Sequence, residues 1–347
     1  MRIEEYDYEL PKELIAQEPC LNRDECKLMV LDKVLKKIYH KKFFEIVDFL
    51  NKNDIIVLNN TKVIPAKLIG YKESTKGKVE LLLISKLNSN KETWEVEINN
   101  KKNIQIGSKI IFNSSLTGEI ISRDGTKIII EFYNKDNIPF SELLEKVGSP
   151  PLPPYIKRSL KDDRDKVNYQ TVYAKSNGSI AAPTAGLHFT KELLNKITKK
   201  GVMITEITLH IGRGTFKPIR AKEIESHNME QEYFEISSDS ADLINNAMKS
   251  GKRIISVGTS TTRALETAFD IGMNRLKSVK DWSRLYMYEG YKFNVINGLI
   301  TNFHLPKSTN LVLTCTFGGR DFILQAYKEA IESRYNFYSY GDAMFII

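Results

Sequence analysis

Short runs of apolar and β-branched residues recur through residues 54 to 150. The run DIIVLNN, from Asp54, predicts a buried strand. Alternating strands are predicted in KVIPAKLIGYK, GKVELLLISKL, TWEVEI, SKIIFN, TGEIISRD and TKIIIEFY. Breaks are expected at Lys76-Gly77, at 88–90, at Gly107, at Gly118 and at Asp124-Gly125. This spacing is typical of a small antiparallel barrel or sandwich, which we place at about residues 64 to 150.

A proline-rich segment follows the predicted strands. PFSELLEKVG predicts a helix that begins after Pro139 and ends at Gly148. The prolines of SPPLPPYIKR favour extended backbone, so we interpret this segment as a stiff hinge between two modules. The alternative is a ligand for the groove of another protein.

Beyond Tyr155 the pattern changes to alternating helices and apolar strands, which indicates α/β layers. Helices are predicted in TKELLNKITKK, capped by Thr190, in SDSADLINNAMKS, opened by Ser238 or Asp239, and in DFILQAYKEAIESRY. GVMITEITLHIG predicts a strand. KRIISVGTSTTRALETA predicts a strand, a turn and a helix whose first amides could bind an anion. NLVLTCTF fits a strand or a buried helix equally.

Composition narrows the class of protein. The 347 residues, 41% of them hydrophobic and 27% charged, suit a globular chain of about two domains. The 51 Lys and Arg exceed the 43 Asp and Glu by 8, which favours acidic partners such as nucleic acid or reflects only a solvated surface. The charged N-terminus and the lack of a long apolar run predict a cytoplasmic protein outside the membrane. Three cysteines without a CxxC pair favour neither disulfides nor zinc.

Histidines and small polar residues gather next to predicted strand ends in the second half. His188, His210, His227 and His304 lie there, and only His40 lies outside it. Imidazoles can move protons near neutral pH, although each could instead be a satisfied structural histidine. HExxH, GxSxG, GxGxxG and P-loop motifs are all lacking, so we expect no metal site and no serine nucleophile.

Six segments in order along the chain carry a family resemblance. They are LNNTKVIPAKL, PLPPYIKR, YQTVYAKSNGSIAAPTAGLHFT, LHIGRGTFKPI, TNFHLPKST and YNFYSYGDAMFI. Together they resemble the S-adenosylmethionine:tRNA ribosyltransferase-isomerases of queuosine biosynthesis. The resemblance implies transfer of the ribosyl part of S-adenosylmethionine onto 7-aminomethyl-7-deazaguanine in a tRNA anticodon, which yields epoxyqueuosine, adenine and methionine. S-adenosylmethionine is then a substrate, and no prosthetic group is expected.

The same resemblance implies a β-barrel domain, residues 64–150, inserted into a larger α/β domain formed by residues 1–63 and 151–347. Proton transfer is expected from three histidines, His188, His210 and His304, of which His188 is the preferred candidate. Asp342 is expected to be an acid or an orienting carboxylate. Arg263 and the amides near Thr259 are candidates for the methionine carboxylate, unless Arg263 pairs with Glu266. The other expected S-adenosylmethionine contacts are Asn59, Asn60, Thr61, Thr184, Gly186, Gly212, Gly214, Thr215 and Asn302.

Contacts to tRNA are expected from Lys62 and from Tyr155, Lys157 and Arg158, where Tyr155 could stack on an unpaired base or be structural. Departures from the family pattern include Lys62 in place of arginine and HNMEQE, which puts Glu230 where histidine is usual. The alternatives are therefore a divergent paralogue with another 7-deazaguanine or RNA acceptor, a non-catalytic RNA-binding protein, and a methyltransferase. Either a monomer or a homodimer is compatible with the sequence.

Overall fold

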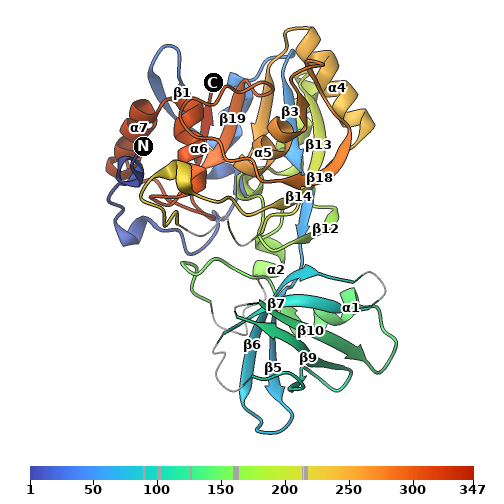
Figure 1. Ribbon diagram of the computed structural model, residues 1–347. Coiled ribbons are helices and arrows are strands. Elements are labelled where there is room, and N and C mark those ends of the chain that lie inside the picture. The colour runs from blue at the N-terminus through green and yellow to red at the C-terminus, as the bar shows by residue number, and fades with distance from the viewer. Residues whose placement is uncertain (89–90, 100–103, 126, 159–163, 213, 215–217) are drawn as a thin grey trace.

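The computed structural model describes residues 1–347 except 89–90, 100–103, 126, 159–163, 213 and 215–217. In the described part, nine strands form one large sheet (Figure 1). Their order is β18 (Val279–Ser283), β14 (Glu232–Ile236), β13 (Met203–Leu209), β3 (Ile55–Asn59), β15 (Ile254–Val257), β19 (Gly298–Asn302), β20 (Ala343–Ile346), β1 (Lys27–Asp32) and β2 (Lys37–Lys42).

Four neighbouring strands of the large sheet, β13, β3, β15 and β19, run parallel. Alternate residues of these strands enter two separate apolar clusters. Ile55 and Val57 pack into one, and Ile56 and Leu58 into the other. The sheet is therefore buried on both faces, as parallel sheets usually are, and the all-buried pattern of Ile55–Asn59 follows from this position.

Helices cover both faces of the large sheet. Residues of α4 (Ser238–Lys249), α5 (Thr259–Ala268), α6 (Thr309–Gly318) and α7 (Arg320–Glu332) pack into the first cluster. The second cluster includes residues of the 3-10 helix η4 (Phe43–Phe49) and of α3 (Lys191–Lys199). Further short helices are α2 (Asp165–Asn168), η1 (Ile3–Tyr6), η2 (Lys12–Leu14), η3 (Arg23–Glu25), η5 (Thr184–His188) and η7 (Ile224–Ser226).

The second sheet is a closed barrel with its own apolar core. Among the described residues, six antiparallel strands close through pairing of β5 with β8, and β11 (Gly148–Ser149) adds to β5. The six are β5 (Lys67–Lys72), β6 (Lys78–Lys86), β7 (Thr93–Asn99), β10 (Lys127–Asn134), β9 (Leu116–Asp124) and β8 (Lys109–Ile111). Helix α1 (Phe140–Val147) packs Leu143 and Leu144 into the barrel core. The expected fold class, an α/β protein with an inserted antiparallel barrel, is confirmed.

Two strand pairs lie outside these sheets. β4 (Thr61–Val63) pairs with β12 (Ser176–Ser179), and β16 (Phe269–Asp270) pairs with β17 (Arg275–Leu276). The predicted strand KVIPAKLIGYK is therefore divided, because β4 ends before Ile64-Pro65-Ala66 and β5 starts after it.

The expected break at Gly118 is wrong, because β9 passes through it. A Cβ atom at Gly118 would lie 2.6 Å from Ile130, so this glycine serves close packing between strands. The actual break precedes β9, where the side chain of Asn113 accepts hydrogen bonds from the amides of Ser115 and Leu116.

Three helix predictions are resolved by the caps. The ambiguous NLVLTCTF is helix α6, and the hydroxyl of Ser308 accepts from the amide of Leu311 at its start. Thr190 caps α3 as predicted. Helix α4 is instead capped by Ser237, one residue before the predicted opening.

Candidate active site

The carboxyl ends of the parallel strands β13, β3, β15 and β19 lie at one edge of the large sheet. His210 follows β13, Asn60 follows β3, Gly258 follows β15 and Phe303 follows β19. Ligands of open α/β sheets bind beyond this edge. Two neighbouring cavities occupy it, and Ile211 and Glu232 line both of them.

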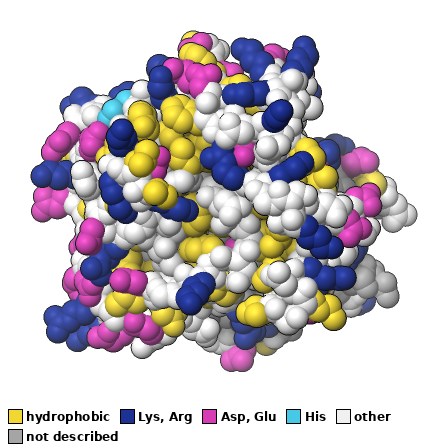
Figure 2. Space-filling view, turned by 90° about the horizontal axis from the view of Figure 1, so that it is seen from above, with side chains coloured by type: hydrophobic (Ala, Val, Ile, Leu, Met, Phe, Trp, Pro, Cys, Tyr) yellow, Lys and Arg dark blue, Asp and Glu magenta, His cyan; other side chains and the backbone are white. Residues whose placement is uncertain are grey.

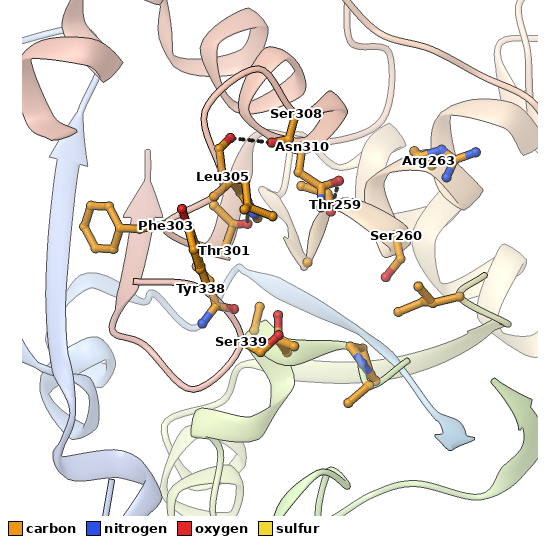
Figure 3. Close-up of a pocket in the computed structure, with 18 of the residues that line it drawn as sticks. Thr259, Ser260, Arg263, Thr301, Phe303, Leu305, Ser308, Asn310, Tyr338 and Ser339 are labelled. Atoms are coloured by element: carbon orange, nitrogen blue, oxygen red, sulfur yellow. Dashed lines mark hydrogen bonds between the residues drawn. The ribbon is translucent and has the colours of Figure 1, made fainter. Parts of the chain in front are cut away.

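The first cavity, here called the inner pocket, encloses a volume of about 60 Å³. Thr259 and Ser260 reach it from α5, while Ser308 and Asn310 reach it from the start of α6 (Figure 3). The hydroxyl of Thr259 donates to Oδ1 of Asn310 at 3.1 Å, which links the two helix starts. The first amides of a helix lack partners within the helix, and both helix dipoles point their positive ends here. The inner pocket therefore suits a carboxylate.

Gly258 permits the sharp entry into α5. Its φ of +92° lies in the region that residues with a side chain avoid, and it is the residue that precedes the helix. Ser256 lies two residues before it, and its hydroxyl donates to the carbonyl of Gly258 at 3.2 Å. The turn thus brings the amides of α5 directly to the end of β15.

Asn302 lines the inner pocket and carries a buried side-chain oxygen without a partner among the described residues. Its side chain is buried, and Oδ1 has no hydrogen-bond partner among the described residues. Nδ2 lies 3.1 Å from Nε2 of His188. A buried acceptor without a partner costs free energy, so a ligand that brings an N–H group to Oδ1 gains from it.

His188 is held behind Asn302 by a chain of hydrogen bonds. Its Nδ1 lies 2.8 Å from Sγ of Cys26, which lies 3.1 Å from the carbonyl of Arg23. A hydrogen bond with Cys20, and burial, raise the pKa of the Cys26 thiol, so the thiol stays protonated. The two contacts fit an imidazole that carries its hydrogen on Nδ1 and accepts from Asn302 at Nε2. Burial lowers the pKa of His188 to about 3, so the ring is neutral and both nitrogens are engaged.

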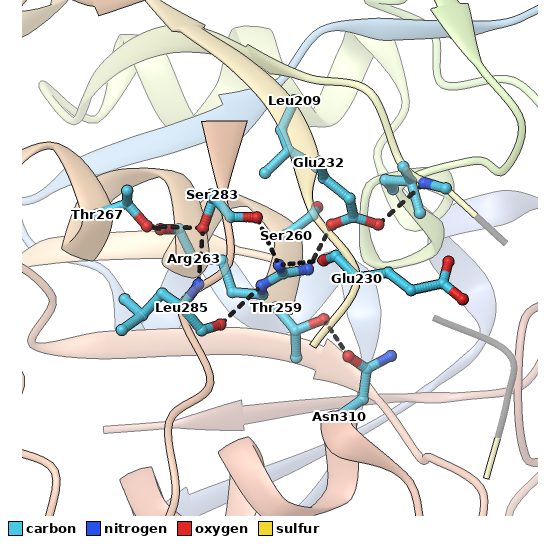
Figure 4. A network of polar contacts seen from close by, with 12 residues as sticks. Leu209, Glu230, Glu232, Thr259, Ser260, Arg263, Thr267, Ser283, Leu285 and Asn310 are labelled. Carbon is cyan, nitrogen blue, oxygen red and sulfur yellow. Dashed lines mark hydrogen bonds and ion pairs between the residues drawn. The ribbon is translucent and has the colours of Figure 1, made fainter. Parts of the chain in front are cut away.

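A buried ion pair closes the side of the inner pocket toward α5. The guanidinium of Arg263 is hydrogen-bonded to Glu232 and donates to the carbonyls of Ser283 and Leu285 (Figure 4). Oε1 of Glu232 accepts from the amide of Gly212 at 2.9 Å. The guanidinium is thus committed to protein acceptors, and its charge is balanced by Glu232.

The expected pairing of Arg263 with Glu266 is wrong. Glu266 instead accepts from the amides of Val295 and Ile296, at 2.9 and 3.2 Å. The two side chains leave α5 toward different loops, so the spacing of three residues along the helix does not bring them together.

The second cavity, here called the groove, has a volume of about 790 Å³ and lies between the barrel and the large sheet. Ser85, Lys86 and Trp94 form the barrel side. Residues that follow or belong to β13, β14 and β18 form the other side, among them His210, Gly212, Glu230, Tyr233 and Trp282.

His210 is the histidine that faces the groove. Nδ1 lies 2.8 Å from the hydroxyl of Thr61, and a Cβ atom at Gly178 would lie 2.7 Å from Nε2. Glycine at this position therefore allows the backbone to pass close to this edge of the ring. Burial lowers the pKa of His210, so the ring is neutral near pH 7 and can accept a proton.

His304 lines the inner pocket, with Nε2 2.7 Å from the hydroxyl of Thr301. Burial lowers its pKa to about 3. Its backbone amide donates to Tyr327, and its carbonyl accepts from Tyr8. These contacts fix the loop after β19.

Several other expected contact residues serve the scaffold. Asn59 bonds through both side-chain atoms to the backbone of Leu209, and Asn60 bonds to Glu206 and Thr208. Gly186 packs against Tyr173. Thr184 and Gly212 line the cavities, and Gly214 lies beside Glu230. Thr215 lies outside the described residues.

Asp342 is not among the residues that line the inner pocket or the groove. Its two oxygens accept from the amides of Lys27 and Asn336, each at 2.7 Å. Burial raises its pKa, with the two backbone hydrogen bonds opposing the shift. The carboxylate therefore joins β1 to the loop before β20, and its contacts are those of a backbone anchor.

The residues expected to contact RNA differ in their surroundings. Tyr155 lines the inner pocket, where its hydroxyl lies 2.7 Å from that of Ser339. Arg158 pairs with Asp165 at 2.7 Å, and both are largely buried. Lys157 is exposed, and Lys62 is half-buried on β4.

Sequence reasoning missed Glu232, Asn310, Trp94 and Trp282. A signal for Glu232 was present, because EYFEI alternates and places the first glutamate on the same buried side as Phe234 and Ile236. Asn310 and the two tryptophans had no comparable local signal.

Two further observations concern cofactors and membranes. Within the described residues, no group of three or more His, Cys, Asp or Glu side chains could hold a metal ion. No described helix has the length and apolarity needed to span a bilayer.

Seen from the side away from the barrel, the basic and acidic side chains are interspersed (Figure 2), so the net positive charge is not gathered on that face.

Fold and cavities together define an α/β protein with an inserted closed barrel and a polar ligand pocket beyond the carboxyl ends of its parallel strands. A family model described as Queuosine biosynthesis protein matches residues 3–346. The S-adenosylmethionine:tRNA ribosyltransferase-isomerases of Clostridioides difficile (strain 630) and Clostridium kluyveri are each 47% identical over 349 residues, which cover both chains completely. The crystal structure of S-adenosylmethionine tRNA ribosyltransferase from Thermotoga maritima is similar, with 32% identity and a TM-score of 0.55, over 99% of this chain and 100% of that one. The chain belongs to the queuosine biosynthesis protein family.

Proposed function

We propose that the protein transfers and isomerises the ribosyl part of S-adenosylmethionine onto 7-aminomethyl-7-deazaguanine at the wobble position of a tRNA anticodon. Epoxyqueuosine in the tRNA, free adenine and free methionine are the products. The observation that carries the proposal is an inner pocket lined by two helix starts, beside a groove lined by a neutral histidine, with Ile211 and Glu232 shared by both. Full-length relatives that bear the corresponding name support it.

The inner pocket fits the amino-acid end of S-adenosylmethionine. Its volume of about 60 Å³ suffices for a carboxylate and an ammonium group but not for the whole molecule. In this pose the carboxylate meets the first amides of α5 and α6, and the ammonium donates to Oδ1 of Asn302. The sulfonium and the ribose then extend past Glu232 into the groove.

This pose places the ribose near His210. The sulfonium acidifies the hydrogens on C5′, and Nε2 of neutral His210 can take one of them, which begins to open the sugar. Adenine leaves, the neutral aminomethyl nitrogen of the modified base attacks the sugar, and closure of the epoxide expels methionine. His188 acts in this scheme as a positioning residue, because both of its ring nitrogens are engaged and it orients Asn302.

We also propose the domain division that the two sheets suggest. The barrel domain comprises residues 64–150, and residues 1–63 with 151–347 form the α/β domain. Because tRNA is the proposed substrate, we also propose a cytoplasmic location. Its state as a monomer or a homodimer stays a prediction.

Transfer of labelled ribose tests the proposed reaction. S-adenosylmethionine labelled in the ribose is incubated with the protein and tRNA that carries 7-aminomethyl-7-deazaguanine. We expect the label to move to the tRNA. Label that stays in the small-molecule fraction would contradict the proposed function, and transfer to unmodified tRNA would contradict the proposed acceptor.

A further inference from the structure

We propose that the groove stacks an unpaired RNA base beside the reacting nucleotide, between Trp282 of the large sheet and Trp94 of the barrel. This inference rests on the proposed function. It also gives the barrel a role in substrate binding, because the barrel then supplies one wall of a site for single-stranded RNA.

A row of rings leads from the candidate base to the surface. The ring centroids of His210 and Tyr233 lie 5.7 Å apart with nearly parallel planes, and those of Tyr233 and Trp282 lie 5.6 Å apart, edge to face. Tyr233 and Trp282 are register partners on β14 and β18. The row therefore stands on one outward face of this part of the sheet.

Trp282 ends the row with 52% of its surface exposed. Exposed tryptophan carries a large apolar face that water solvates poorly, and such faces mark interaction sites when they line a cavity. Trp282 lines the groove. The alternation of β14 keeps Phe234 and Ile236 in the core and leaves Tyr233 beside Trp282, so the aromatic surface is not needed for the core.

Trp94 faces the same groove from the barrel. Its indole Nε1 donates to Glu92 at 3.0 Å, and Glu92 pairs with Lys86 at 2.7 Å. The ring also packs against Phe140 of α1, with centroids 6.0 Å apart. These contacts hold the indole in one orientation, so little side-chain entropy is lost when a base stacks on it.

The charges in the groove favour a base over a phosphate. Lys86 is paired with Glu92, and the groove contains the carboxylate of Glu230. Arg284 donates to the neutral amide oxygen of Gln231 and keeps its positive charge. Arg284 can hold a neighbouring phosphate, but the charges of the described lining residues do not make a track for an RNA backbone. Aromatic rings that accept unpaired bases are the usual solution for single-stranded RNA.

Binding of an anticodon stem-loop tests the inference. The stem-loop carries 7-aminomethyl-7-deazaguanine, and its affinity is measured at fixed salt without S-adenosylmethionine. We expect Trp282→Ala and Trp94→Ala each to weaken binding about 5- to 100-fold, the range for loss of one stacked base. Trp282→Phe should retain most of the affinity, and Tyr71→Ala, at an exposed ring of β5 outside the groove, should bind like the wild type.

A second arm identifies what the rings bind. Stem-loops with an abasic residue on either side of the modified nucleotide should bind the wild type weakly, and Trp282→Ala should weaken them little further, because both changes remove the same contact. Arg284→Ala should lower the salt dependence of binding, and the tryptophan variants should not. Affinity for S-adenosylmethionine, measured by calorimetry, should be unchanged in the tryptophan variants.

Binding within twofold of the wild type in both tryptophan variants would overturn the inference. So would additive losses from the abasic stem-loop and Trp282→Ala, because the rings would then contact something else, such as a protein segment. Failure of the proposed function is a separate result, since a wild-type protein that transfers no ribose can still be scored for binding of the stem-loop.

Discussion

The side chain of Asn302, a lining residue of the inner pocket, is held by His188, whose Nε2 lies 3.1 Å from Nδ2, and Oδ1 is left buried without a partner among the described residues. The two residues are 114 positions apart in the chain. His188 is itself held by Cys26. His188, which the sequence suggested as a catalytic base, therefore positions Asn302, the proposed binding residue.

Loss of the acceptor should weaken binding of S-adenosylmethionine. We expect Asn302→Ala to lower affinity about 10- to 100-fold, since a hydrogen bond to a charged group contributes about 1.5–3 kcal/mol. Calorimetry measures the affinity, and Asn53→Ala at an exposed loop position is the control. If Oδ1 met no ligand group, Asn302→Ala would bind S-adenosylmethionine as tightly as the control.

His188 and His210 should differ in their kinetic effects. His210→Ala removes the proposed base, so kcat should fall about 10²- to 10⁴-fold. His188→Ala disturbs the orientation of Asn302 and removes no proposed base, so it should mainly raise the KM for S-adenosylmethionine. Steady-state kinetics measure the split, with His40→Gln on β2 as the control. A larger loss of kcat in His188→Ala than in His210→Ala would reverse the assignment.

The pH dependence of kcat/KM should carry the signature of a buried base. His210 must be neutral to accept a proton, and burial lowers its pKa below the ordinary 6.5. Activity should therefore stay level down to about pH 6.5 and fall only at lower pH, as the ring becomes protonated. A fall that begins well above pH 7 would indicate a different base.

The Arg263–Glu232 pair should matter for stability. Both partners are buried, so Glu232→Ala leaves a buried guanidinium without its carboxylate and should cost about 3–5 kcal/mol. Glu235→Ala on the same strand removes an exposed pair with Lys280 and should cost at most about 1 kcal/mol. Urea denaturation at pH 7 gives both values, and equal losses would show that the buried pair is not what stabilises this region.

Stability should also depend on pH through His188. Its pKa is about 3 in the folded protein and about 6.5 in the unfolded chain, so between these values the unfolded state binds the extra proton. The free energy of unfolding should thus fall as pH falls, by about 2 kcal/mol from this group between pH 7 and pH 5. His188→Gln removes this contribution. If the free energy of unfolding fell by the same amount between pH 7 and pH 5 in the variant and in the wild type, the predicted contribution of His188 would be refuted.

Local pattern predicted much of the fold. Three features depend only on residues that are close together in the sequence, and so could be predicted. They are the alternation of the barrel strands, the capping threonine of α3 and the Gly-Thr-Ser turn before α5. NLVLTCTF was undecided because α6 is apolar on almost every side, and its helical state depends on the cap from Ser308 and on burial. The break predicted at Gly118 was wrong because glycine occurs where strands pack closely as well as where they end.

The site was less predictable because its contacts join distant segments. Arg263 meets Glu232, 31 residues away, and His188 meets Cys26, 162 residues away. Asp342 anchors the backbone of Lys27, 315 residues away. Residue type and spacing identified the strand ends where polar groups gather, but the partner of each group decides whether it binds ligand or supports the scaffold.

Product analysis tests the central claim most directly. Wild-type protein, S-adenosylmethionine and tRNA carrying 7-aminomethyl-7-deazaguanine are mixed, and the small molecules are separated. The account predicts that adenine and methionine appear in equal amounts, matched by the gain of one epoxyqueuosine per tRNA. Intact S-adenosylmethionine after prolonged incubation, or S-adenosylhomocysteine as the product, would contradict it.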